Sequence, residues 1–364
     1  MFSYFKTPGK NNKAYTIAFY NLENLFDTKD DPNTLDDDFT PNGRKNWNYK
    51  RYKRKIRKLG NVIEQLGTEK SYHSPAIVGV VEVENQTVLQ VLINTNSLKK
   101  YNYGVVHYDS PDERGIDVAL LYKKELFELL HSETFPLYLE RNNGERDYTR
   151  DILLVKGNLN GELIHVIVNH WPSRRSGEDK SEVKRIKAAK LVNEIVEKIN
   201  LETENPKVII MGDFNDNPSN ISIKKYLVNN TFYNPMEHLI NTGNGTLNYK
   251  KTWHLFDQII FSKNFFNIDE KKHSFKYAEI FDKHFLKELK GKHKGNPFRT
   301  YIGKWYQGGF SDHFPVYVYL KQNWQQAKKN SNLFSLSFYV FRAVFMKLLI
   351  LKATNKFYLF LLGF

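Results

Sequence analysis

The sequence predicts a mixed α/β layer protein with a single large domain. Short apolar runs rich in β-branched residues, which are typical of strands, outnumber the segments with helical periodicity. Several neighbouring strands look antiparallel, which is typical of a mixed α/β layer protein. No linker rich in Pro, Gly or Ser interrupts residues 13–320, and 364 residues are ample for one sizeable core. We therefore expect one domain over residues 13–320, followed by a separate tail at 321–364.

The first elements are a strand, an acidic loop and a basic helix. Residues 14–20 (AYTIAFY) predict a buried strand that ends at Asn21. The acidic loop 27–38 lacks the spacing of a calcium loop and is interpreted as solvated surface. From Tyr49 apolar residues recur at helical spacing, and basic residues fill the intervening positions between 50 and 58. We interpret these basic residues as a solvated helix face, with a nucleic-acid groove as the alternative.

The rest of the domain predicts further strands and one long helix. The helix is expected over residues 178–200, where Val192, Ile195, Val196 and Ile199 recur at helical spacing. The expected strands are residues 76–81, 118–122, 152–155, 163–168, 208–211, 256–261 and 315–320.

The composition restricts the chemistry. The chain has no cysteine, which excludes disulfides, zinc-thiolate sites and cysteine nucleophiles. Its 54 basic and 40 acidic residues give a net charge of +14. Such a balance suits a polyanionic or phosphate-bearing partner, although solubility alone is an alternative explanation.

The two termini give expectations about location. Residues 1–21 lack the apolar core and the cleavage site of a secretory signal, so a cytoplasmic protein is expected. Residues 333–351 are nearly all apolar, but Arg342 and Lys347 interrupt them. Each would cost roughly 2.5 to 3.5 kcal/mol at a bilayer centre, so contact with a membrane surface is favoured over a span. A tail without function is the other interpretation, and we expect a monomer.

Polar groups stand at the ends of most predicted strands. A lone Glu or His at such a place is usually an ordinary surface or structural residue, but a whole set is different. Side chains at consecutive strand ends can converge on one crevice. The residues concerned are Asn21, Glu82, His170, Asp213, Asn215, Asp257, Asp312 and His313.

These residue types suit the hydrolysis of a phosphoester. Carboxylate and amide oxygens, with no thiolate, favour a hard cation such as Mg²⁺ or Mn²⁺. An imidazole backed by a carboxylate has a fixed orientation and a stabilised cationic form. A further carboxylate can orient and deprotonate a water for in-line attack.

The motifs NLEN, EVEN, NHW, GDFND, FDQI and SDHFPV, in this order, resemble those of the endonuclease/exonuclease/phosphatase superfamily. The most specific part is GDFND followed downstream by SDHFPV. The resemblance covers about residues 14–320. It implies a four-layer α/β sandwich, in which two mixed, mostly antiparallel sheets pack face to face with helices outside.

The resemblance also implies a role for each site residue. Glu82, Asn21 and Asp312 would hold or orient the metal. His170 would hold or protonate a phosphate oxygen, and Asn215 would steady the transition state. Asp213 would orient or deprotonate the water and Asp257 would pair with His313, with the choice of base between Asp213 and His313 left open.

Three more residues are candidate substrate contacts. Arg150 precedes a predicted strand and could reach a phosphate, as could Arg174 after NHWPS. An ordinary surface ion pair is the alternative for both. Asn85, at the end of EVEN, is the third candidate.

The function expected from these features is metal-dependent hydrolysis of a phosphodiester, foremost in nucleic acid, in an endonuclease-like reaction. The alternative is a phosphatase or phospholipase that acts on a lipid headgroup or a small phosphoester. A non-catalytic binding module is disfavoured, because groups suited to acid–base chemistry rarely persist together for structure alone.

Overall fold

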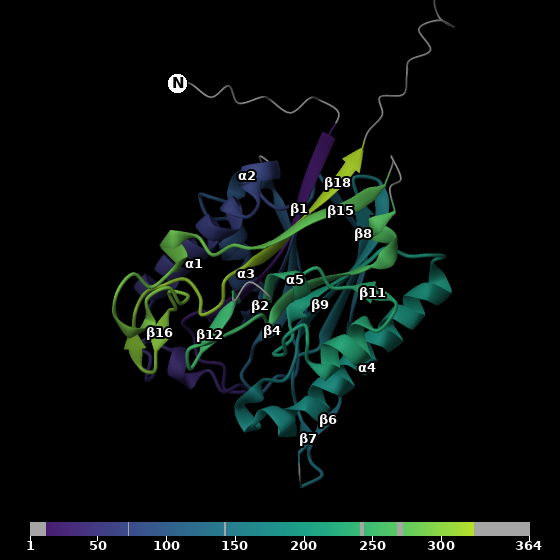
Figure 1. Ribbon diagram of the computed structural model, residues 1–364. Coiled ribbons are helices and arrows are strands. Elements are labelled where there is room, and N and C mark those ends of the chain that lie inside the picture. The colour runs from purple at the N-terminus through teal and green to yellow at the C-terminus, as the bar shows by residue number, and fades with distance from the viewer. Residues whose placement is uncertain (1–11, 72, 142, 241–243, 268–271, 324–364) are drawn as a thin grey trace, which may run out of the picture. The chain divides into compact units, whose positions relative to one another are not determined.

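Two six-stranded mixed sheets form the frame of the protein (Figure 1). The computed structural model describes residues 12–71, 73–141, 143–240, 244–267 and 272–323, and Lys13–Gln322 form one compact unit. The predicted tail spans residues 321–364, and its residues 324–364 lie outside the part that the structure describes. Among the described residues, none of the helices has the length and apolar character needed to cross a membrane.

The first sheet has the strand order β15-β18-β1-β2-β4-β3. Strands β1 and β2 run parallel, whereas the pairs β2/β4, β3/β4 and β15/β18 are antiparallel. In chain order its strands are β1 (Asn12–Leu25), β2 (Ile77–Val83), β3 (Tyr103–His107), β4 (Asp117–Lys123), β15 (His273–Ile280) and β18 (Val316–Asn323).

The second sheet has the order β11-β14-β10-β9-β8-β5. Strands β9 and β10 run parallel, and the other four neighbouring pairs are antiparallel. Its strands are β5 (Phe127–Phe135), β8 (Ile152–Leu159), β9 (Glu162–His170), β10 (Val208–Asp213), β11 (Phe232–Tyr233) and β14 (Asp257–Ser262).

Alternation along the strands builds the layers, because successive side chains of a strand point to opposite faces. In β10, Ile209 and Met211 face the first sheet, while Val208 and Ile210 join a separate apolar cluster with the helix α4 (Glu178–Glu202). The two sheets approach closely at Gly79, where an added Cβ would lie 2.5 Å from the Met211 sulfur. The sheets therefore pack face to face.

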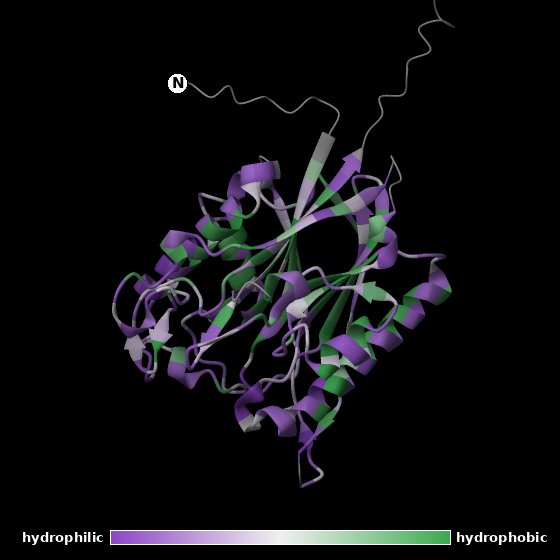
Figure 2. Ribbon diagram, in the orientation of Figure 1, coloured by the Kyte–Doolittle hydropathy of each residue, from purple (hydrophilic) through white to green (hydrophobic). Residues whose placement is uncertain are grey.

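Helices cover both outer faces. In Figure 1 the helices α1 (Tyr49–Gln65) and α3 (Gln86–Ile93) lie on the side of the first sheet, and α4 lies on the side of the second. Figure 2 shows apolar residues gathered on the central strands and hydrophilic residues on the outward faces of α1 and α4. The predicted sandwich of two mixed sheets with helices outside is confirmed.

Smaller elements complete the chain. Three two-stranded ribbons pair β6 (Leu139–Glu140) with β7 (Arg146–Asp147), β12 (Leu247–Tyr249) with β13 (Thr252–His254), and β16 (Tyr301–Ile302) with β17 (Trp305–Tyr306). The short helices are α2 (Thr68–Ser71), α5 (Glu237–Ile240), a π-helical segment at Ser222–Val228, and 3₁₀ turns at Asp37–Phe39, Lys99–Tyr101, Arg174–Ser176, Lys263–Phe266, His284–Leu286 and Gly291–His293.

The structure differs from the predicted elements in two places that matter for the site. Strand β1 continues past Asn21 through an irregularity in its pairing with β2, so Asn21 and Glu23 lie inside the strand. Lys55, expected on a solvated face of α1, is only 1% exposed. Its helical position relative to Tyr52 and Ile56 places it on the buried face.

Candidate active site

The carboxyl ends of the parallel strands bring the predicted residues together. Because β9 and β10 run parallel, His170 and Asp213 are paired neighbours. On the other side of β10, antiparallel β14 places Asp257 opposite Asp213. In the first sheet, the parallel strands β1 and β2 carry Asn21 and Glu82 to the same edge. A hydrogen bond from Asn21 Nδ2 to Asp213 Oδ2, 3.0 Å long, joins the two sheets at this edge.

His313 is held by two carboxylates. Its Nδ1 lies 2.7 Å from Asp257 Oδ2, and its Nε2 lies 3.9 Å from Asp213 Oδ2. Burial opposes protonation of the ring, but the two carboxylates outweigh burial and raise the pKa of His313 well above its usual value. His313 is therefore an imidazolium at neutral pH.

Asp213 is buried and firmly oriented. Asn21 donates to its Oδ2, and the backbone N–H of Asn215 donates to its Oδ1 at 3.0 Å. Burial raises the pKa of Asp213 to about 6, although His313 acts in the opposite direction. At neutral pH this carboxylate is ionised yet remains a usable proton acceptor.

Glu82 presents one free oxygen to the site. Its Oε2 accepts a 2.9 Å hydrogen bond from the backbone N–H of Asn24. Around Oε1 stand His170 Nε2 at 3.9 Å and Arg114 Nη2 at 3.8 Å, both beyond hydrogen-bond length. Glu82 has a φ of +60°, which is uncommon for a residue other than glycine and is typical of functional sites.

His170 is buried and neutral. Its Nε2 lies 3.9 Å from both Glu82 Oε1 and Asp213 Oδ2. Burial, together with the nearby guanidinium groups of Arg150 and Arg114, lowers the pKa of His170 well below its usual value. The ring can therefore donate one N–H to a phosphate oxygen but does not supply an acidic proton at neutral pH.

Asp312 is fixed by an arginine that the sequence motifs did not indicate. Arg299 Nη2 donates to Asp312 Oδ2 at 2.6 Å, and its Nε lies 3.6 Å from Glu23 Oε1. Burial acts to raise the pKa of Asp312, but Arg299, His313 and Lys55 outweigh it and lower that pKa. The carboxylate therefore stays ionised.

Lys55 and Glu23 form a buried pair beside this arginine. Lys55 Nζ lies 3.6 Å from Glu23 Oε2 and donates to the Glu23 carbonyl at 2.5 Å and to Thr300 Oγ1 at 2.6 Å. The backbone N–H of Thr300 donates to Glu23 Oε2 at 2.6 Å. This network ties α1 and the segment before Asp312 to β1.

Asn215 turns back onto the second sheet. Its φ is +51°, and its Nδ2 donates to the carbonyl of Trp171 at 2.9 Å. The side-chain oxygen accepts no hydrogen bond from the described residues. The expected transition-state role of Asn215 stays a prediction.

The three predicted substrate contacts have internal partners. Arg150 is 8% exposed and donates to Asp112 at 2.9 Å and to the carbonyls of His170 and Trp171. Arg174 bonds Asp216 Oδ1 at 2.6 Å and the Asn215 carbonyl at 2.7 Å. Asn85 caps helix α3 by accepting from the backbone N–H of Val88. The structure places none of the three in the cluster around Glu82 and Asp213.

The donors of the site fit a divalent cation that prefers oxygen. The nearest charged nitrogens to Glu82 Oε1 lie at 3.8 and 3.9 Å, and the buried Asp257 Oδ1 has no hydrogen-bond partner among the described residues. Asp213, Asp257 and His313 also offer ligand atoms that lie within 4.8 Å of one another. Because His313 is cationic and paired with Asp257, Glu82 with Asn21 is the better place for the ion.

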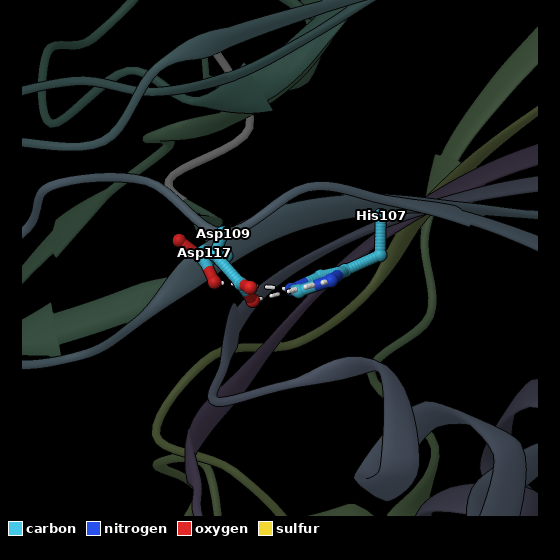
Figure 3. Close-up of side chains that lie close together, drawn as sticks. All are labelled: His107, Asp109 and Asp117. Carbon is cyan, nitrogen blue, oxygen red and sulfur yellow. Dashed lines mark hydrogen bonds and ion pairs between the residues drawn. The ribbon is translucent and has the colours of Figure 1, made fainter. Parts of the chain in front are cut away.

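A second His/Asp group lies on the hairpin of β3 and β4 (Figure 3). His107 Nε2 lies 3.0 Å from Asp117 Oδ2, and its Nδ1 lies 3.9 Å from Asp109 Oδ1. Asp117 Oδ1 accepts from both the backbone N–H and the hydroxyl of Ser110. With these contacts made within the protein, the group stabilises the base of the loop between the two strands.

The solved structures with a similar fold have low sequence identity to this chain. A humanized TDP2 of D. rerio shares 14% identity, with a TM-score of 0.51, over 84% of this chain and 98% of its own. A mannosyl-6-phosphatase of Bacteroides thetaiotaomicron shares 19%, with a TM-score of 0.50, over 84% of this chain and 99% of its own. The human Nocturnin catalytic domain with bound sulfate shares 14%, with a TM-score of 0.52, over 85% of this chain and 93% of its own.

Among curated proteins, none gives a significant match to this sequence. The family comparison is decisive. Residues 16–322 match the model of the Endonuclease/Exonuclease/phosphatase family. The resemblance seen in the motifs is therefore confirmed, and the chain belongs to this family of phosphoester hydrolases.

Proposed function

We propose that the protein is a divalent-metal-dependent phosphodiesterase that cleaves nucleic acid in an endonuclease-like reaction. The observation that supports the proposal is the meeting of Glu82, Asp213 and His313 from both sheets in one buried cluster. Asp213 and His313 have pKa values shifted in ways that suit different tasks, and Glu82 has one oxygen whose nearest charged nitrogens lie beyond hydrogen-bond length. A hydrolytic reaction needs groups that differ in this way.

The attacking water is activated by Asp213. Its carboxylate is oriented by Asn21 and by the backbone of Asn215, and its raised pKa matches the task of accepting a proton near neutral pH. We assign the base to Asp213 rather than to His313, because Asp257 and Asp213 raise the pKa of His313 well above its usual value. The water gives its proton to Asp213 as its oxygen attacks phosphorus, in line with the departing oxygen.

The charge that develops on the phosphoryl oxygens is met by His313 and His170. The imidazolium of His313 offers its Nε2–H on the Asp213 side, and neutral His170 offers one N–H on the Glu82 side. The departing oxygen takes its proton from solvent water, because the Nε2–H of His313 is beside the base and already meets a phosphoryl oxygen. A divalent ion held by Glu82 and Asn21 would supply further charge neutralisation on the phosphate.

The surface next to the site favours nucleic acid. The β16/β17 ribbon packs on α1, where the Arg51 guanidinium lies 4.4 Å from the centroid of the Tyr306 ring. At the ribbon tip Trp305 is 67% exposed beside exposed Lys304. The outward positions of α1 add four exposed cations, which are Lys50, Lys53, Arg54 and Arg57.

This surface, named here the α1–ribbon surface, joins the site through the backbone N–H of Thr300, which donates to Glu23. Cations follow the phosphates of a strand, and an exposed indole can stack on a base. A single small phosphoester needs neither feature. Longer substrates should therefore bind more tightly than mononucleotides.

The test is a substrate panel with Mg²⁺ and with Mn²⁺. It compares plasmid DNA, single-stranded DNA, RNA, phosphoinositides, sphingomyelin and sugar phosphates, with His313→Ala as the inactive control. We expect nicking of nucleic acid that weakens steeply as the salt concentration rises. Turnover of the lipids or sugar phosphates alone would replace the proposal with the second one, a phosphatase or phospholipase.

The α1–ribbon surface has its own control. Trp305→Ala and Lys304→Ala should weaken oligonucleotide binding, whereas Lys187→Ala, which removes an exposed cation from α4, should not. Equal affinity in all three variants would remove the argument for nucleic acid.

A further inference from the structure

The loop between β3 and β4 presents an arginine to the site that none of the predicted roles includes. Arg114 Nη2 lies 3.8 Å from Glu82 Oε1, and His170 Nε2 lies 3.9 Å from the same oxygen. The Arg114 side chain is 29% exposed and is therefore partly open to solvent. We infer that Arg114 is a substrate-binding residue that contacts a non-bridging phosphate oxygen beside His170; the inference rests on the proposed phosphoesterase function.

A closed ring of contacts positions this arginine. The backbone N–H of Arg114 donates to Asp112 Oδ1 at 3.0 Å. Asp112 Oδ2 accepts from Arg150 Nη1 at 2.9 Å, and Arg150 Nη2 donates to the carbonyl of His170 at 3.1 Å. The ring closes through Glu82 Oε1, which lies within 4 Å of both Arg114 Nη2 and His170 Nε2. Arg150 is thus a positioning residue that fixes Arg114 relative to His170.

The loop backbone is shaped for the same placement. Gly115 follows Arg114 with a φ of +64°, a conformation that side chains rarely adopt. Its N–H donates to the carbonyl of Asp112 at 2.9 Å, and a Cβ at this position would lie 2.9 Å from the side chain of Thr34. The preceding Glu113 carbonyl accepts from the N–H of Leu35 at 2.8 Å. The arginine is therefore held in place before any substrate arrives.

The charge balance explains why the guanidinium needs an anion. In the protein alone, Glu82 is the carboxylate nearest to the terminal nitrogens of Arg114, and 3.8 Å is too long for a hydrogen bond. A divalent cation bound at Oε1 would neutralise that carboxylate. The guanidinium would then keep only Asp112, whose Oδ1 lies 3.9 Å from Arg114 Nε and whose Oδ2 is bonded to Arg150. A phosphoryl group would supply the closer partner, because guanidinium donors match phosphate oxygens in geometry and charge.

The competing explanation is that Arg114 only orients Glu82. The two explanations differ in what they require of the metal site. A residue that orients Glu82 must change the affinity for the ion, whereas a phosphate contact must change the affinity for phosphate. Equilibrium titrations separate the two without any turnover.

The experiment uses the full chain with Arg114→Gln and Arg114→Lys. Inorganic phosphate is titrated by calorimetry in the presence of Mg²⁺, and Mn²⁺ binding is measured separately by electron paramagnetic resonance. We expect Arg114→Gln to weaken phosphate binding about tenfold to a hundredfold, with Arg114→Lys in between, as the loss of a charged hydrogen bond implies. The affinity for Mn²⁺ should be unchanged or tighter, because a positive charge has been removed.

Lys124→Gln is the matched control. It removes one exposed cation just beyond the other end of β4 and should leave both affinities unchanged. Unchanged phosphate binding in Arg114→Gln would overturn the inference, and so would a parallel loss of Mn²⁺ affinity. Failure of the wild type to hydrolyse any phosphoester would count against the proposed function, while the phosphate titration would still report on Arg114.

Discussion

His313 Nδ1 lies 2.7 Å from Asp257 Oδ2, and Asp257 in turn lies opposite Asp213 in the register of β14 and β10. The imidazole is thus fixed between two buried carboxylates that belong to neighbouring strands. The two adjacent groups therefore suit different tasks in the proposed reaction, in which Asp213 would accept a proton and His313 would remain a cation.

Removal of this cation should abolish most of the activity without unfolding the protein. We expect His313→Ala and Asp257→Asn each to lower kcat by a factor of roughly 10² to 10⁴, because a positioned cation and its orienting carboxylate act as one unit. For the same reason the double variant should lose little more than either single one. Steady-state kinetics on the substrate found in the panel measures the effect. The exposed His284→Ala is the control, and additive losses would contradict the coupling of the pair.

The activity should depend on pH with an acid limb near 6. Burial raises the pKa of Asp213 to about 6, and its protonation below that value removes the base. The raised pKa of His313 places loss of the imidazolium on the alkaline side. The profile of kcat/KM should therefore be bell-shaped. An acid limb near pH 4, the usual pKa of an aspartate, would show that burial does not raise the pKa of the base.

The catalytic cluster could be predicted because its members come from strand ends. A residue such as Glu82 follows an apolar run directly, and the carboxyl ends of parallel strands meet at one edge. Arg114 and Arg299 come instead from long loops, whose course no local pattern fixes. Arg150 was a candidate substrate contact because it precedes a strand, and its partner Asp112, 38 residues away, gave no local signal of the ion pair.

The sequence analysis missed strand β5 for a similar physical reason. Strand β5 (Phe127–Phe135) is largely exposed and carries His131 and Glu133 on one side, so its apolar alternation is weak. It is a strand because it pairs along its whole length with β8 at the edge of the sheet. Lys55 is the opposite case, because its i, i+4 spacing from Leu59 on α1 could have indicated the buried face that the sequence analysis missed.

Lys55 is expected to stabilise the fold through Glu23. In Lys55→Met the carboxylate of Glu23 would keep only Arg299 as a nearby cation, and we expect the free energy of unfolding to fall by about 1 to 3 kcal/mol. Denaturant unfolding monitored by circular dichroism measures this. The exposed Lys53→Met on the same helix should change stability by less than about 0.5 kcal/mol. The double variant Glu23→Gln with Lys55→Met should recover part of the loss, and no recovery would contradict an electrostatic cause.

His165 gives a prediction about stability and pH that is independent of catalysis. It lies on β9 at 1% exposure, and neither ring nitrogen has a hydrogen-bond partner among the described residues. Burial, with a smaller effect of Lys156, lowers the pKa of His165 to about 4. The unfolded chain therefore binds the proton more readily than the folded protein. The contribution of neutral, buried His165 to the free energy of unfolding is complete above about pH 6.5 and is lost as the pH falls to about 4. We expect wild type to lose on the order of 2 kcal/mol more than His165→Leu between pH 7 and pH 4, after solvent screening is allowed for. Denaturant unfolding at both pH values measures the difference, with the exposed His131→Asn as the control, and a difference that stays constant with pH would show that His165 is not the titrating group.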